Sequence, residues 1–187
     1  MGMVVSHTYK VFALVVAGCF ATGAAATDDA MARLGIGRDA SAAKIAAADL
    51  TVLPDGAGLP EGKGAAKAGA VVFAAHCAAC HGDKGQGLGD FPALVGGRGT
   101  LSTDEPRLTV GSYWPYAPTL FDYIRRAMPY QAAGELSADD VYALTAWILA
   151  RNGIIGQSKV IDRHSLPEVR MPNRKGFVAD PRPDHPN

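Results

Sequence analysis

The sequence contains few cysteines, few aromatic residues and no net charge. Three cysteines occur in 187 residues, and two of them lie in one short motif, which excludes a framework of several disulfide bonds. Lysine and arginine together number 18, as do aspartate and glutamate, so nothing indicates a polyanionic partner such as nucleic acid. With 22 glycines and 12 prolines, much of the chain is expected to be loop, which a bound cofactor could stabilise.

The sequence also lacks an apolar run of the ~20 residues that a permanent membrane-spanning helix requires. A shorter apolar run covers residues 11–21, with Lys10 before it and a small-residue cleavage site at Ala24 to Ala26. This pattern predicts that residues 1–26 are an export signal peptide and that the mature chain is periplasmic. A buried N-terminal helix is the alternative.

Cys19 leaves a second processing route open. Residues 16–19 (VAGC) resemble a bacterial lipobox, in which Cys19 would be lipidated after cleavage. We favour ordinary cleavage, which removes Cys19 and leaves Cys77 and Cys80. Contact with a membrane is therefore expected only if Cys19 carries a lipid.

The mature chain is expected to hold one helical domain, residues 65–153, between two arms. Residues 27–64 are rich in Ala, Gly and Asp, with one plausible helix over residues 41–50. We interpret them as an N-terminal arm that lies over the domain or over a partner, with a disordered linker as the alternative. Residues 154–187 contain several prolines and no long periodic run, which predicts an extended C-terminal tail and no second domain.

Three helices are predicted in the domain, and they make its fold class all-α. Their ranges are residues 65–79, 119–127 and 137–151. Pro118 favours the start of the second helix and Pro129 ends it. In the third helix, Ser137 can cap the first turn, with Asp140 completing a weak capping box. The apolar residues of this helix repeat at helical spacing: Val141, Leu144, Thr145, Ile148 and Leu149.

Residues 77–81 (CAACH) form a C-x-x-C-H motif, the signature of c-type haem attachment. Two thiols three residues apart on a helical turn can reach the two vinyl groups of one porphyrin, and the next residue then points its imidazole at the iron. The motif predicts one covalent haem c, attached to Cys77 and Cys80, with His81 as an axial ligand of the iron. A thioredoxin-like redox pair would need a βαβ setting, and a structural zinc site would need four ligands.

The iron needs a sixth ligand, or else an open position for catalysis. Met128 precedes Pro129, which fixes the backbone beside it, whereas Met171 has a similar setting in the tail and Met31 lies in the arm. We predict Met128 as the ligand, with Met171 as the alternative; filling a gap in the core is the ordinary role of either. His/Met ligation raises the reduction potential and closes the iron, so the predicted function is outer-sphere transfer of single electrons.

A ligating imidazole usually donates its second N–H to a carbonyl, which fixes the orientation of the ring. Pro92, in the loop after His81, could supply that carbonyl, although an ordinary turn proline is the alternative. Nothing in the spacing of His76, His164 and His185 indicates a second metal, and we expect these side chains at the surface.

The chain resembles the class I cytochromes c. In that family a glycine lies eight residues, and an aromatic residue four residues, before the first haem cysteine, as Gly69 and Phe73 do here. A C-terminal helix carries a leucine and an aromatic residue that cross this first helix, as Leu144 and Trp147 would. The resemblance implies a class I cytochrome c fold, here with extended N- and C-terminal arms, and a methionine ligand in the position of Met128.

A narrower resemblance, to the cytochrome subunits of sulfane dehydrogenases, rests on longer strings. The strings are residues 50–59 (LTVLPDGAGL), 96–101 (GGRGTL), 110–116 (VGSYWPY), 120–129 (LFDYIRRAMP) and 170–173 (RMPN). This resemblance implies a partner subunit with a molybdenum cofactor, of the sulfite-oxidase type, and a downstream cytochrome as electron acceptor. Longer members of that family carry a second CxxCH, which this sequence lacks, so sulfite and sulfane sulfur both remain possible substrates of the partner.

The expected role is therefore that of a subunit or dedicated acceptor of such a dehydrogenase. A free periplasmic shuttle and a haem enzyme that acts directly on a sulfur substrate are the alternatives. Several side chains are candidates for contact with haem propionates or with a partner, although each could also be an ordinary surface residue. They are Tyr113, Trp114, Tyr116, Arg98, Arg125 and Arg126.

Overall fold

The computed structural model describes residue 37 and residues 39–179, and the predicted signal peptide lies outside them. The chain divides into two units, residues 1–45 and 46–187, which are described separately. Helix α2 (Ala42–Ala48) spans the division, and each of its residues is exposed. The side chain of Ser41 accepts a hydrogen bond from the Lys44 N–H at 3.3 Å at the start of this helix. The helix lies within residues 41–50, the range predicted for it.

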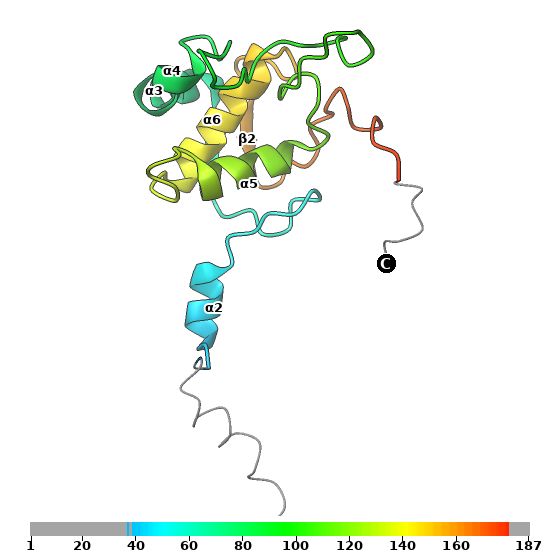
Figure 1. The fold of residues 1–187 in the computed structure, drawn as a ribbon. Helices are drawn as coiled ribbons and strands as arrows, with labels where there is room; N and C mark the ends of the chain where they lie inside the picture. The colour runs from blue at the N-terminus through cyan, green and yellow to red at the C-terminus, as the bar shows by residue number, and fades with distance from the viewer. Residues whose placement is uncertain (1–36, 38, 180–187) are drawn as a thin grey trace, which may run out of the picture. The chain divides into compact units, whose positions relative to one another are not determined.

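Helix α6 (Ala138–Arg151) is the centre of the second unit, and its ten residues from Val141 to Ala150 are all buried. An isolated apolar stripe would bury only one face, whereas a helix that is apolar all round needs neighbours on every side. Helices α3 and α5 and both strands contact it (Figure 1). The predicted cap is confirmed, because Ser137 Oγ accepts the Asp140 N–H at 3.2 Å. The Asp140 carboxylate accepts the Ser137 hydroxyl, so the predicted capping box is incomplete.

Helix α3 (Ala66–His76) crosses α6 at very short range. A Cβ atom placed on Gly69 would lie 1.9 Å from the carbonyl oxygen of Ala143, so only glycine fits this crossing. One turn further on, the rings of Phe73 and Trp147 stack with centroids 3.9 Å apart. The close crossing expected from Gly69 and Phe73 is therefore present.

Helix α5 (Ala117–Ala127) packs on α6 from another side, with the rings of Phe121 and Tyr142 4.5 Å apart. Pro118 lies in its first turn, where a missing N–H costs nothing. The helix thus begins two residues before its predicted start and ends at the predicted residue, and Met128 is its C-cap.

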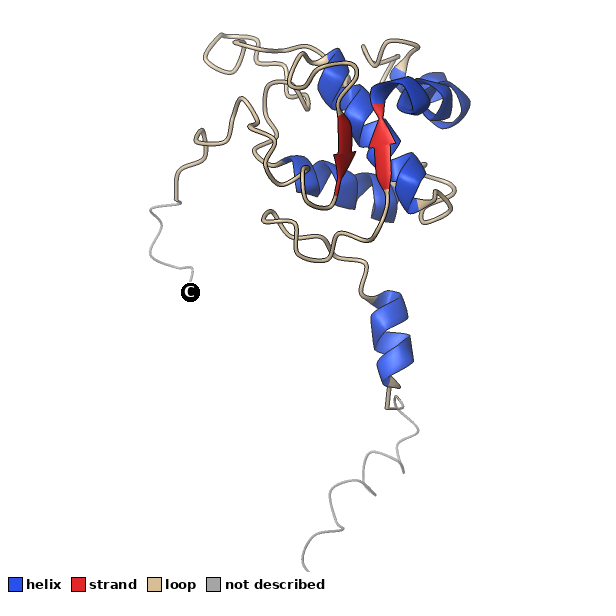
Figure 2. Cartoon of the chain, turned by 180° about the vertical axis from the view of Figure 1, so that it is seen from behind, coloured by secondary structure: helices blue, strands red, loops and turns tan. Residues whose placement is uncertain are grey.

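A two-stranded antiparallel sheet was not predicted. Strand β1 (Lys63–Ala65) pairs with β2 (Val160–Asp162), so the end of the N-terminal arm lies beside the C-terminal tail (Figure 2). A Cβ on Gly64 would lie 2.1 Å from the Ala143 nitrogen, which places the backbone of β1 directly on α6. The predominantly helical fold class is confirmed, since the sheet has only two strands of three residues each.

Both arms supply side chains to the hydrophobic core. Val52 and Leu59 from the N-terminal side are buried, as are Ile161, Leu166 and Met171 from the C-terminal side. The hydroxyl of Tyr142 donates to the Pro60 carbonyl at 2.8 Å. Burial, reinforced by the Asp162 carboxylate, raises the Tyr142 pKa to about 12, which keeps this donor protonated. Residues 50–65 therefore lie over the domain, as one of the two interpretations of the arm expects, and the tail is packed onto the domain instead of being merely extended.

One buried carboxylate fastens the N-terminal arm to α5. Asp122 is 8% exposed; its Oδ1 accepts the Val52 N–H at 2.8 Å, and both of its oxygens accept hydrogen bonds from the Arg126 guanidinium. Burial alone would raise the pKa of Asp122, but the hydrogen bonds from Arg126 and Val52 and the charges of Arg126 and Arg125 outweigh burial and lower it. The ionised form is thus the one that the fold stabilises.

Replacing Gly69 by alanine tests the crossing of α3 and α6. Alanine favours a helix over glycine by about 1 kcal/mol, so a helix without the crossing would become more stable. At the crossing, we expect Gly69→Ala to lower the free energy of unfolding by about 1–3 kcal/mol, because the added methyl group meets the Ala143 carbonyl. Chemical denaturation of the haem-loaded protein measures this. Gly156→Ala is the control, since a Cβ there meets no atom within 4 Å. A Gly69→Ala protein that is more stable than the unmodified one would contradict the close packing of α3 on α6.

The lowered pKa of Asp122 predicts a pH dependence of stability. A carboxyl whose pKa is lower in the folded state adds stability above its unfolded pKa of about 4, and the contribution is lost as the pH falls through the folded pKa. We expect Asp122→Asn to be less stable by about 1–3 kcal/mol at neutral pH. The difference from the unmodified protein should be constant above pH about 5 and should shrink below pH about 4. Urea denaturation over this pH range measures it, and a difference that persists unchanged in acid would refute the assignment.

Candidate functional site

The CxxCH motif begins where α3 ends. The helix predicted over residues 65–79 stops at His76, because the backbone of Cys77 leaves the helical region (φ −124°, ψ −33°). A separate short helix, α4 (Ala78–His81), follows. The Cys77 carbonyl accepts the N–H groups of Cys80 and His81 at 3.1 and 2.9 Å. The two cysteines and the histidine therefore share a single turn, as the motif requires, although this turn is not a continuation of α3.

The two thiols of the motif are free, and the environment of Cys77 differs from that of the reactive thiol in a redox pair. Cys77 is half-buried and Cys80 is exposed. Burial, with a smaller contribution from the Cys80 sulfur, raises the pKa of the Cys77 thiol to about 11. Thioredoxin-like pairs depend on a lowered pKa, which provides a thiolate at neutral pH. The site therefore disfavours thiol–disulfide exchange and is compatible with thiols that form covalent bonds to a cofactor.

The imidazole of His81 is held by the carbonyl predicted for it. Its Nδ1 lies 2.8 Å from the Pro92 oxygen. A carbonyl can only accept, so Nδ1 carries the proton and Nε2 keeps a lone pair for a metal. This is the arrangement in which a histidine ligand is fixed by its second nitrogen, and the hypothesis about Pro92 is confirmed.

Asn152 positions the loop that carries Pro92, and the sequence reasoning missed it. At the C-terminal end of α6, its Oδ1 accepts the Gly96 N–H at 2.9 Å, while its Nδ2 donates to the carbonyls of Leu94 (3.1 Å) and Ile148 (2.9 Å). The amide thus ties residues 94–96 to the end of the buried helix. In the sequence, the only local signal was an asparagine before Gly153, which indicates a turn but does not identify the groups with which Asn152 forms hydrogen bonds.

The two candidate methionine ligands lie in different environments. Met128 is half-buried and packs against the core, as Cys77 does, and its N–H donates to the Ile124 carbonyl at 3.0 Å. Met171 is 3% exposed and belongs to the core itself. Met31 lies outside the described residues. A thioether at the edge of the core can face a cofactor, whereas a side chain enclosed by the core fills space.

The three aromatic candidates for docking contact other parts of this chain. The ring of Tyr113 meets Phe177 edge-on with centroids 5.2 Å apart, and its carbonyl accepts a hydrogen bond from the Asn173 side chain. The Arg174 guanidinium lies 4.2 Å from the ring centroid of Tyr116. These contacts attach the C-terminal tail to the segment before α5.

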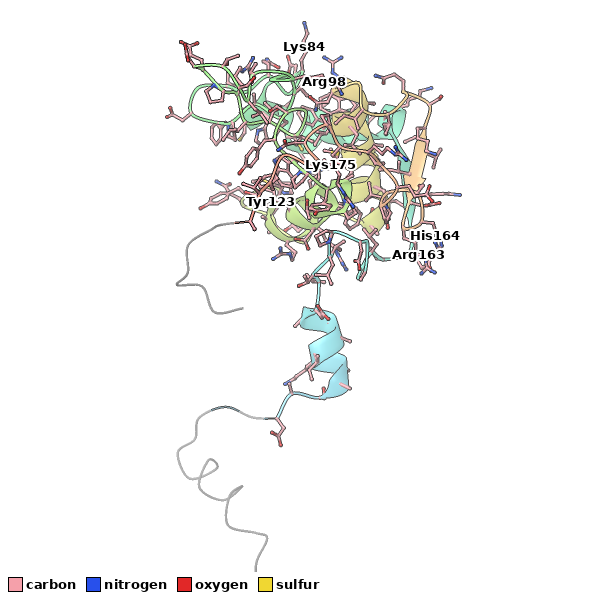
Figure 3. All side chains as sticks on the ribbon, turned by 90° about the vertical axis from the view of Figure 1, so that its right-hand side faces the viewer. Lys84, Arg98, Tyr123, Arg163, His164 and Lys175 are labelled. Carbon is pink, nitrogen blue, oxygen red and sulfur yellow. The ribbon has the colours of Figure 1, made fainter. Side chains whose placement is uncertain are left out.

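Of the remaining candidates, Arg98 lines the same cavity as Tyr113, whereas Trp114, Arg125 and Arg126 have other contacts. Trp114 meets Tyr123 edge-on, and Tyr123 lies apart from Arg98 in Figure 3. Arg126 is paired with Asp122, and a guanidinium nitrogen of Arg125 lies 3.5 Å from the Leu50 carbonyl. These two arginines therefore hold the arm, and the docking role considered for them stays a prediction.

Two further kinds of site were sought in the part of the chain that the structure describes, a cluster of metal ligands and a membrane-spanning helix. No three His, Cys, Asp or Glu side chains gather there in a way that could hold a metal ion, which removes the zinc alternative for this part. His76 and His164 are exposed, as predicted, while His185 lies outside the described residues. Among the helices of the same part, none has the length and apolar character needed to cross a bilayer.

The residues present fit a covalently attached haem. They provide two adjacent free thiols, an imidazole whose Nδ1 is occupied and whose Nε2 is available, and a half-buried thioether. Cys77 and Cys80 would form the thioether bonds, and His81 and Met128 would ligate the iron.

Comparisons with known proteins agree with this donor set. Residues 66–152 match the protein family described as cytochrome c. The crystal structure of the sulfane dehydrogenase SoxCD from Paracoccus pantotrophus contains a chain with 45% identity and a TM-score of 0.75; the match covers 81% of this chain and 74% of that one.

A thiosulfate dehydrogenase (TsdBA) from Marichromatium purpuratum matches 46% of this chain and 18% of that chain, with 28% identity and a TM-score of 0.37, which is too low to carry an argument. No curated protein matches the chain in sequence. The family match, the extent and identity of the match to the sulfane dehydrogenase chain, and the helical fold agree. The chain belongs to the cytochrome c family, whose members carry covalently attached haem and transfer electrons.

Proposed function

We propose that this chain is a periplasmic, monohaem c-type cytochrome that takes single electrons from a molybdenum-cofactor dehydrogenase acting on sulfane sulfur or sulfite. It would work as a subunit of that enzyme or as its dedicated acceptor, and would pass the electrons to a downstream cytochrome. The observation that carries this proposal is the extent of the likeness to the sulfane dehydrogenase chain. That likeness covers 81% of the chain, far more than the cytochrome c match at residues 66–152, so it includes a large part of the arms.

The arms also weigh against a free shuttle. The CxxCH motif, the Pro92 carbonyl and Met128 all lie within residues 66–152, so a shuttle could work without arms. Here the arms supply buried side chains and a strand each. Features shared with a chain of a dehydrogenase, but not needed to hold haem, are expected to serve that enzyme.

The donor set favours electron transfer over catalysis at the iron. Haem supplies one-electron chemistry, and a His/Met pair leaves its iron no open position for a substrate. In this proposal, His81 would hold the haem iron through Nε2 while the Pro92 carbonyl holds its other nitrogen, and Met128 would be the second protein ligand. The haem would supply one-electron chemistry, and the substrate would be oxidised on the partner.

Replacing Met128 tests the sixth ligand. Leucine keeps most of the volume but lacks the sulfur, so we expect Met128→Leu to abolish the weak long-wavelength band of the oxidised protein that reports a sulfur–iron bond. The reduction potential should also fall, because a thioether ligand raises it. Visible spectroscopy and a redox titration of the purified protein measure both.

Met171→Leu is the matched control, because it makes the same exchange inside the core. It should keep both the band and the potential, with a loss of stability below about 1.5 kcal/mol. The opposite pattern, in which only Met171→Leu loses the band, would assign the ligand to the tail. A protein without the band before any substitution would favour the alternative of a haem enzyme with an open position.

Purification from the native host tests the partner. A tagged chain should retain a molybdenum-containing protein, and the isolated complex should reduce its haem on addition of sulfite or of a protein-bound sulfane. Metal analysis and the visible spectrum give the two readouts. A molybdenum-free monomer at every salt concentration would instead support a free shuttle.

A further inference from the structure

Asp122 is a buried carboxylate that bonds the N-terminal arm to α5. It is 8% exposed and accepts hydrogen bonds from two separate parts of the chain, the Val52 N–H of the arm (2.8 Å) and the Arg126 guanidinium (Nε at 2.9 Å). Val52 and Asp122 are 70 positions apart in the sequence. A buried carboxylate with these partners is costly to disturb, because each lost partner leaves a buried polar group unsatisfied.

Two further contacts, made by Arg125 and by Val52, also attach the arm to the last two turns of α5. Arg125 reaches the Leu50 carbonyl at 3.5 Å, two residues before Val52. The side chain of Val52 is 3% exposed and joins the core cluster. Residues 50–52 therefore lie against the C-terminal half of α5 and form hydrogen bonds with Asp122 and Arg125 of that helix.

Met128 follows directly at the end of this half-helix. It is the C-cap of α5, two residues after Arg126, and its N–H donates to the Ile124 carbonyl at 3.0 Å. The next hydrogen bond along the chain, from the Ala132 N–H to the Pro129 carbonyl, belongs to a local turn. The position of the Met128 backbone thus depends on how firmly the end of α5 is held.

We propose that Asp122 is a positioning residue for the sixth ligand: by bonding Val52 and Arg126 together, it holds the end of α5 in the place from which the Met128 sulfur reaches the iron. The inference rests on the proposed function, in which Met128 is that ligand. It gives residues 50–52 of the N-terminal arm a task at the haem, because their release from α5 would weaken the bond between sulfur and iron.

The chain offers a matched control for this idea. Asp139 also fastens the arm, since its Oδ1 accepts the Lys63 N–H at 2.7 Å, but it lies on α6. Loss of Asp139 loosens the same arm without touching α5. A purely structural role for arm fastening predicts similar effects for the two aspartates, whereas positioning of Met128 predicts an effect at the iron for Asp122 alone.

Competition with added imidazole measures the hold on the methionine. Imidazole enters only when the sulfur leaves, so its apparent affinity rises with the fraction of molecules in which the sulfur is detached. For purified, haem-loaded Asp122→Ala we expect imidazole to bind about tenfold more tightly than in the unmodified protein, the effect of losing one charge-assisted hydrogen bond. The long-wavelength band should weaken in parallel, and Asp139→Ala should stay within about twofold.

Asp122→Asn covers the case in which the alanine variant fails to fold. It keeps an oxygen for the Val52 N–H but loses the charge that holds Arg126, so we expect an intermediate rise in imidazole affinity. Unchanged imidazole binding in a folded Asp122 variant would overturn the proposal, and so would equal effects of Asp122→Ala and Asp139→Ala. Failure of the underlying ligand assignment is seen separately, as a Met128→Leu protein that keeps its band.

Discussion

The fold depends on the contact between backbones at Ala143, in the middle of the buried helix α6. A Cβ on Gly69 of α3 would lie 1.9 Å from the Ala143 oxygen, and one on Gly64 of β1 would lie 2.1 Å from its nitrogen. Two segments thus approach the same residue at distances that no side chain permits. Since protein interiors are close-packed, fixing α3 and β1 at one point of α6 also fixes the direction in which each continues.

Both sides of the haem site follow from this arrangement. Helix α3 leads directly to Cys77, and the end of α6 carries Asn152, which holds the loop whose Pro92 carbonyl orients His81. Helix α5, packed on α6 through Phe121 and Tyr142, ends at Met128. A single buried helix therefore positions both the loop that orients His81 and the helix that ends at Met128, the proposed sixth ligand.

Features marked by recognisable residue types could be predicted, and features that depend on distant backbone groups could not. The cap at Ser137, the stacking of Phe73 on Trp147 and the carbonyl of Pro92 each involve recognisable residue types. The partners of Asp122 and Asn152 are backbone groups 70 and 56 positions away, which any residue type provides. The same reason hides the pairing of β1 with β2, since three-residue strands show no period and pair through backbone atoms.

The arm covers part of α5 and is bonded to the half of that helix that ends at Met128. Asp122 lies beneath Val52, while the neighbouring Leu53 is 50% exposed, so the arm forms part of the outer surface of α5. Arg126 is engaged with Asp122, and Arg174 covers Tyr116, so these side chains already have partners within the chain. A partner that docks beside α5 would therefore meet the surface that the arm builds. With Asp122 in the role proposed for it, the same arm would link docking to the ligand of the iron, and a cytochrome without arms would have no such link.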